Sequence, residues 1–200
     1  MNPGNIAPHV NLYRRNLLGI VRPLLAPHAP VERALDFGCG DGLFAKVFQE
    51  SGLAREVVAV DVQRRRRTLV EPLLYDGSRL PFADGSFDLV YALDVLHHCP
   101  DPRASLADLL RCSRNLVLLK DHTYGSLAGR ATLAVLDEIG NRRFGVPSIY
   151  KYQRGWEWLP AIEEAGFKRE ALVHPAVCET RPPLSWFVNR LHFVGLWRRA

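Results

Sequence analysis

A glycine-rich segment, Leu35–Gly42 (LDFGCGDG), is the part of the sequence best suited to bind a ligand. Its glycines at positions 38, 40 and 42 permit tight turning and close approach of a ligand to the backbone. The segment follows a short apolar run and opens a predicted helix, whose first N–H groups have no partner within the helix. The acidic residues Asp36 and Asp41 would repel a pyrophosphate, so the turn suits a cationic or amino-bearing ligand better. Leu43 stands where a nicotinamide-binding GxGxxG turn has its third glycine, which disfavours a nicotinamide dehydrogenase.

A second candidate contact is Asp61, which ends the apolar run Val57–Asp61, 23 residues after Gly38. An acidic residue at this distance from a glycine turn is placed to accept hydrogen bonds from ribose hydroxyls. The alternative is that Asp61 only caps the following segment. The strand end, the spacing and the glycine turn together favour ribose binding.

Histidine and aspartate residues follow two later predicted strands. His97 and His98 come after the fourth strand, and Lys120-Asp121-His122 follows the fifth. An Asp-His pair at this edge can supply an oriented general base. We therefore take His122, Asp121 and His97 as catalytic candidates, with packing or loop capping as the alternative role. No metal site is expected, because the four cysteines include no close pair and His98-Cys99 lacks a third ligand at suitable spacing.

Alternating strands and helices must position these residues. The apolar runs predict strands over 33–37, 56–60, 69–75, 87–92, 115–120, 167–174 and 191–197, and helices over 12–25, 43–50, 102–111, 126–139 and 156–165. A short helix with a solvated face is expected around Arg64–Arg67. This alternation predicts a doubly wound α/β sheet of seven strands with helices on both faces. We expect the last strand to be antiparallel, in a hairpin-like pair with no helix between the last two strands.

Four segments resemble class I S-adenosylmethionine-dependent methyltransferases, particularly the small-molecule, type 11-like branch. They are LDFGCGDG (35–42), VVAVD (57–61), YDGSRLPFADGSFDLVYALDVLHH (75–98) and the AGF turn at Ala165. The resemblance implies a Rossmann-like fold with S-adenosyl-L-methionine as cofactor. It also implies an N-terminal helical extension over 1–30 and one methyltransferase domain over 31–200, with an insertion or lid at about 123–160.

The resemblance also assigns contacts to the cofactor. Gly38 and Gly40 would lie against its methionine part, with Asp36 near the ammonium group. The ribose would be held by Asp61, with Val62 beside it. Contacts to the adenine would come from Asp76, Gly77 and Ser78, and Asp94 would face the sulfonium and the substrate entrance.

The resulting prediction is an enzyme that methylates a small organic acceptor at oxygen, nitrogen or carbon. The alternatives are a non-catalytic protein that binds S-adenosylmethionine or S-adenosylhomocysteine, and a methyltransferase that modifies RNA or protein. Of the 200 residues, 48% are hydrophobic and 24% charged, which is typical of a globular chain. The net charge of +5 is scattered along the chain, so we expect no nucleic-acid partner. With no apolar stretch of membrane-spanning length, we expect no stable membrane association and a cytoplasmic location. The sequence does not indicate the oligomeric state.

Overall fold

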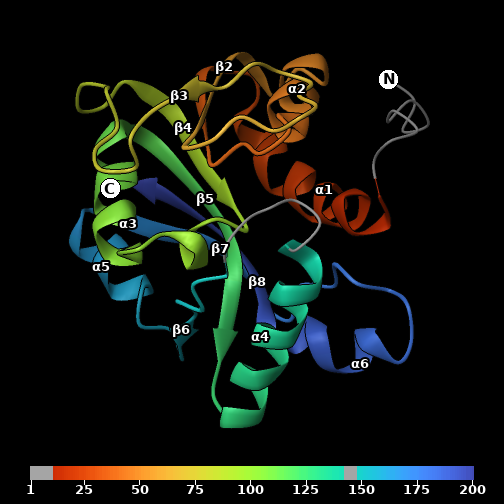
Figure 1. The fold of residues 1–200 in the computed structure, drawn as a ribbon. Coiled ribbons are helices and arrows are strands. Elements are labelled where there is room, and N and C mark those ends of the chain that lie inside the picture. The colour runs from red at the N-terminus through yellow and green to blue at the C-terminus, as the bar shows by residue number, and fades with distance from the viewer. Residues whose placement is uncertain (1–10, 142–147) are drawn as a thin grey trace.

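The computed structural model describes residues 11–141 and 148–200. Its strands form one sheet in the order β3-β2-β1-β4-β5-β8-β7, and the short strand β6 pairs with β5 (Figure 1). The strands are β1 (Val31–Phe37), β2 (Ala54–Asp61), β3 (Leu73–Leu74), β4 (Phe87–Leu93), β5 (Ser113–Tyr124), β6 (Gln153–Arg154), β7 (Phe167–Val173) and β8 (His192–Arg199). The helices are α1 (Leu12–Leu25), α2 (Leu43–Glu50), α3 (Pro102–Cys112), α4 (Leu127–Asn141), α5 (Leu159–Glu164) and α6 (Leu184–Val188). All the pairs among β1–β6 are parallel, whereas β8 is antiparallel to β5 and β7. The predicted doubly wound fold with an antiparallel last strand is confirmed. The short strand β6 was not predicted.

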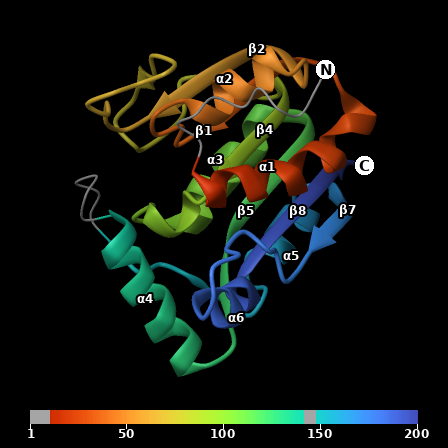
Figure 2. The same cartoon turned by 90° about the vertical axis from the view of Figure 1, so that its right-hand side faces the viewer.

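Helices cover both faces of the sheet (Figures 1 and 2). Successive strand residues point to opposite faces, so Ala34 and Tyr91 pack with α1 and α2 in one core, while Leu35 and Val90 pack with α3 and α5 in the other. The parallel strands are therefore buried on both sides, as their near-continuous apolar runs predict. This burial fixes the carboxyl ends of β1, β2, β4 and β5 along one edge of the sheet.

Helix α1 forms over the predicted residues. The Asn11 side chain caps its first turn by accepting a hydrogen bond from the backbone N–H of Arg14 at 2.9 Å. Four leucine and valine side chains on one face are buried: Leu17, Leu18, Val21 and Leu25. Burial of that face holds α1 against the sheet, which brings the residues of its first turn to the carboxyl edge.

The prediction for the segment after β2 is wrong. Arg64–Arg67 form no helix but an irregular loop, in which Arg64 pairs with Glu71 at 2.6 Å. Four consecutive charges offer no apolar face that could hold a helix against the sheet. The predicted strand at 69–75 shrinks to the two exposed residues of β3, because Pro72 has no N–H to extend the ladder.

The C-terminal part also differs from the prediction. Helix α6 separates β7 from β8, and β8 lies between β5 and β7, so the last two strands do not follow one another directly. Helix α5 is shorter than predicted and begins at Leu159, where Pro160 occupies the first turn that tolerates proline. In the predicted lid, residues 142–147 lie outside the described residues. None of the helices in the described ranges is long and apolar enough to cross a membrane.

Candidate active site

The glycine turn joins the carboxyl end of β1 to the start of α2. Gly38 and Gly40 have φ angles of 70° and 59°, in the left-handed region that favours glycine. The backbone N–H groups of Gly38 and Cys39 both donate to the carbonyl oxygen of Val60, at 2.9 and 3.0 Å. A Cβ at Gly38 would collide with the Val95 side chain, whereas a Cβ at Gly40 would meet nothing within 4 Å. The turn therefore needs glycine at position 38 to close and leaves open space at position 40.

A cavity of about 760 Å³ lies over this turn. Its wall is made by the turn, the start of α1, the loop after β2 and the end of β4. Four of the residues predicted to contact a cofactor line it: Asp36, Gly38, Gly40 and Asp94. Arg64–Arg67 line it as well, so these charges face the cavity instead of a solvated helix face.

The other predicted contacts lie beside the cavity, at the ends of β2 and β3. Asp61 is buried and accepts hydrogen bonds from the backbone N–H groups of Gly40 at 2.8 Å and Gln63 at 3.1 Å. It therefore supports the glycine turn, and its partner Gln63 lines the cavity. Val62, Asp76, Gly77 and Ser78 form an exposed rim, where the Asp76 carboxylate accepts from the backbone N–H and the hydroxyl of Ser78.

Asp36 is a buried carboxyl whose Oδ2 atom has no hydrogen bond of full geometry among the described residues, and the nearby Tyr91 hydroxyl only partly offsets the effect of burial on its pKa. Burial raises the pKa of Asp36 to about 7. Leaving such an atom unpaired costs about 1–3 kcal/mol. Because Asp36 lines the cavity, a ligand that carries an ammonium or amino group there would supply the missing donor.

Tyr13 at the start of α1 and Lys120 on β5 belong to the site, although neither was predicted from the sequence as a site residue. The Tyr13 hydroxyl donates to Asp94 at 2.8 Å, and the wholly buried Lys120 ammonium contacts both the Tyr13 hydroxyl and Asp94. Burial opposes ionisation of Asp94, but the Lys120 charge holds the pKa of Asp94 below its ordinary value. The next residue, Arg14, forms an ion pair of 2.6 Å with Asp41 of the glycine turn. The one available signal was Lys120, because a lysine inside an apolar strand requires a buried partner.

His97, in the loop after β4, lies between the carboxylates of Asp121 on β5 and Asp137 on α4. Its Nδ1 atom is 2.6 Å from Asp121 Oδ1, and its Nε2 atom is 3.8 Å from Asp137 Oδ1. Burial lowers the pKa of His97, but the charge and hydrogen bond of Asp121 outweigh burial and, with Asp137, raise the pKa to about 10. His97 is therefore an imidazolium at neutral pH, and it links the loop after β4 to β5 and α4.

His122 is the neighbouring histidine with partial access to solvent, at 15% side-chain exposure. Its Nδ1 atom lies 3.4 Å from both His97 Nδ1 and Asp121 Oδ1, and its Nε2 atom is 3.7 Å from Asp94 Oδ1. Burial lowers the pKa of His122, and the positive charge of Lys120 lowers it further. His122 is thus neutral at pH 7 and can accept a proton. The structure brings the three catalytic candidates His122, Asp121 and His97 into one cluster.

Two groups within this cluster have the composition of metal ligands. One contains His97, Asp121 and His122, and the other His97, His98 and Asp137, with ligand atoms within 4.8 Å of one another. Both groups depend on His97, whose two nitrogens carry protons when it is an imidazolium and then offer no lone pair. A metal ion in either group would have to displace a proton from His97.

Comparison with known proteins gives one matching domain family. Residues 35–116 match the family described as "Methyltransferase domain". The chain is 33% identical over 138 residues to the demethylmenaquinone methyltransferase of Renibacterium salmoninarum, covering 62% of this chain and 57% of that protein. It is 29% identical over 185 residues to the 27-O-demethylrifamycin SV methyltransferase of Amycolatopsis mediterranei, covering 84% and 65%. The chain spans only part of these relatives: 57% of the demethylmenaquinone methyltransferase and 41% of the malonyl-[acyl-carrier protein] O-methyltransferase of Serratia marcescens, which is 34% identical over 107 residues, or 49% of this chain.

Solved structures share the whole fold. An S-adenosylmethionine-dependent methyltransferase from Mesorhizobium loti superposes with a TM-score of 0.68 at 19% identity, covering 94% of this chain and all of that one. Magnesium protoporphyrin IX methyltransferase from Synechocystis, solved with bound S-adenosylhomocysteine, gives a TM-score of 0.62 at 18% identity, covering 97% and 90%. At these identities the likeness is one of fold.

Proposed function

We propose that this chain, a class I S-adenosylmethionine-dependent methyltransferase by its matched domain and its fold, transfers a methyl group from S-adenosylmethionine to a small organic acceptor. The observation that carries the proposal is the cavity over the glycine turn, where a buried and unpartnered carboxylate oxygen of Asp36 lies beside backbone that is open at Gly40. Asp36 suits a ligand with an amino group, and the arginines that line the same cavity suit a carboxylate on that ligand.

The residues of the cavity fit S-adenosylmethionine part by part. Asp36 would accept from the ammonium group, and Arg14 offers a cation for the carboxylate of the methionine part. Asp61 keeps free lone pairs for the ribose hydroxyls, since each of its oxygens accepts one backbone hydrogen bond, from Gly40 or from Gln63. The rim of Asp76, Gly77 and Ser78 is where the adenine would lie.

When bound, S-adenosylmethionine supplies a methyl carbon already activated by the sulfonium, so the protein's own task is to align the acceptor and exclude water. Helix α1 covers one side of the cavity and is tied to it at both Tyr13 and Arg14. The Lys120 charge keeps Asp94 ionised at the end of β4, where its carboxylate would face the positive sulfonium.

His122 would remove the proton when the acceptor is a weakly acidic hydroxyl or amine. Asp121 and the imidazolium of His97 hold the Nδ1 side of the His122 ring. Asp121 and His97 are thus positioning residues, and His122 is the group that would touch the acceptor.

The affinity for S-adenosylhomocysteine is expected to depend on the ionisation of Asp36. Its pKa of about 7 means that the carboxyl is protonated at lower pH and must lose this proton before it can pair with the ligand's ammonium group. We expect the dissociation constant to be nearly constant above pH 7 and to rise toward tenfold per unit as the pH falls below 7. Calorimetric titrations between pH 5.5 and 8.5 measure this dependence.

The matched variant is Asp36→Asn, which keeps the shape and removes the titration. It is expected to bind more weakly at pH 8 and to lose the dependence around pH 7. A wild-type affinity that does not change with pH, or the same dependence in the variant, would refute the role of Asp36.

A further inference from the structure

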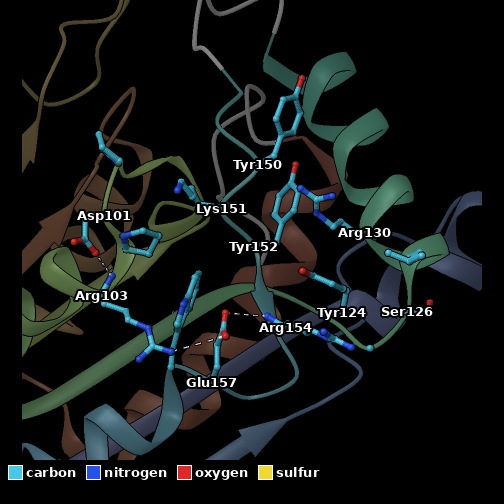
Figure 3. A pocket seen from close by; sticks show the side chains of 15 residues that line it. Asp101, Arg103, Tyr124, Ser126, Arg130, Tyr150, Lys151, Tyr152, Arg154 and Glu157 are labelled. Carbon is cyan, nitrogen blue, oxygen red and sulfur yellow. Dashed lines mark hydrogen bonds and ion pairs between the residues drawn. The ribbon is translucent and has the colours of Figure 1, made fainter.

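A second cavity of about 760 Å³ lies at the far end of β5, between the loop after β4, helix α4 and strand β6 (Figure 3). Tyr124, Tyr150, Tyr152 and Trp158 give it aromatic walls. Tyr152 and Trp158 are buried, so the floor of the cavity is rigidly packed. None of the residues assigned above to the cofactor or to catalysis lines this cavity.

The charges around this second cavity are unbalanced. Its acidic residues are both engaged: Asp101 caps α3 by accepting from two backbone N–H groups, and Glu157 accepts from the backbone of Arg154 and pairs with Arg103 at 3.8 Å. The side chains of the other three cations, Arg130, Lys151 and Arg154, have no ion-pair partner among the described residues. Figure 3 shows Arg130 beside Tyr152 and Lys151 on the side of Asp101. Cations gathered in a hollow raise the local concentration of anions.

An apolar extension adjoins this basic cavity along α4. A smaller cavity of about 230 Å³ has Ala131 and Ala134 in its wall. It shares its other lining residues with the larger cavity: Leu127, Arg130, Tyr150 and Tyr152. Leu127 is 84% exposed. Such an exposed leucine beside unpaired cations suits a ligand with one charged end and one apolar end.

One layer of side chains separates this cavity from the one over the glycine turn. The Tyr152 hydroxyl donates to Asp137 at 3.0 Å, and His98 Nε2 lies 3.7 Å from the same carboxylate. Tyr152 lines the second cavity and His98 lines the first. The His97 ring lies between them, with its centroid 5.6 Å from that of Tyr152.

We propose that the second cavity is a binding site, separate from the site of methyl transfer, for an organic acid with a carboxylate and an aromatic or aliphatic body. Binding of the acid does not depend on the methyl transfer proposed above. Arg130 pairs with the carboxylate, Lys151 adds positive charge on the other side of Tyr152, and the tyrosines and Leu127 pack on the body. The guanidinium of Arg130 matches a planar carboxylate in shape and charge.

Binding of 3-phenylpropanoate tests the charge requirement, with 3-phenylpropanamide as the neutral match and inorganic phosphate as an anion without an apolar body. Calorimetry or tryptophan fluorescence follows binding. The wild-type protein is expected to bind the acid at least about tenfold more tightly than either the amide or phosphate. The double variant Arg130→Ala/Lys151→Ala is expected to lose at least about tenfold in affinity for the acid. Lys168→Ala, an exposed charge on β7, is the control and should bind as the wild type does.

Equal affinity for the acid and its amide, an unchanged affinity in the double variant, or no binding of the acid up to 10 mM would overturn the proposal. Phosphate binding as tight as that of the acid would show that the site does not recognise the organic body of the ligand, which would also overturn the proposal. S-adenosylhomocysteine is titrated into the same samples. In the wild-type protein, absence of acid binding with intact S-adenosylhomocysteine binding counts against the acid site alone, and the reverse result counts against the methyltransferase function alone.

Discussion

Replacing His122 by alanine is expected to slow methyl transfer by about 10²–10⁴-fold, the usual contribution of a general base. Because His122 is not among the residues assigned above to cofactor contacts, the dissociation constant of S-adenosylhomocysteine should change by less than about twofold. The measurement is the initial rate of S-adenosylhomocysteine formation with an acceptor found by screening small organic acids and phenols. In the wild type the rate should fall only as the pH drops below the ordinary range for histidine, because burial and Lys120 lower the pKa of His122.

His28→Ala is the matched control for this variant. His28 pairs with Glu170 at 2.8 Å, away from the catalytic cluster, and its loss should leave the rate unchanged. An unaffected rate in the His122 variant would return this residue to a structural role. A rate lost together with cofactor binding would point to damage of the site as a whole.

Replacing His97 by alanine is expected to lower the free energy of unfolding by about 3–5 kcal/mol, the cost of removing one partner of a buried ion pair. The loss arises because Asp121 is buried and then has neither the imidazolium nor water to balance its charge. Urea unfolding followed by circular dichroism measures this change. The double variant His97→Leu/Asp121→Asn should recover much of the stability, since it removes the stranded charge as well.

The pH dependence of stability tests the same ion pair. The pKa of His97 is about 10 in the folded protein, above its ordinary value of 6.5. The stabilisation is therefore complete below about pH 6.5 and is lost as the pH rises toward 10. The alanine variant should lack this decline. A small stability loss with an unchanged pH profile would show that His97 is neutral and merely packed.

The glycine turn and its flanking elements could be predicted from sequence because local signals agree there. An apolar strand, three glycines and an amphipathic helix occur in succession, and α2 spans the predicted residues. The segment at 62–75 could not be predicted in this way. Its arginines carry no periodic apolar pattern, and only the structure shows that they line a cavity.

The catalytic cluster was predicted in part. Asp121 and His122 are neighbours in sequence, and the pairing of β4 with β5 as parallel strands brings His97 to them. The contact of Tyr13 with Asp94 spans 81 positions of the chain and depends on how α1 packs, so no local pattern could reveal it. The contact with Asp121 that makes His97 an imidazolium is likewise a tertiary property.

Calorimetric titration with S-adenosylhomocysteine, with NAD in a parallel cell, tests the central claim most directly. The wild-type protein is expected to bind S-adenosylhomocysteine and not NAD. The Asp61→Ala variant is expected to bind it more weakly by about 1–3 kcal/mol, through the lost hydrogen bonds to the ribose. Binding of NAD, silence toward both ligands, or unchanged affinity in a folded Asp61→Ala protein would contradict the cofactor site described here.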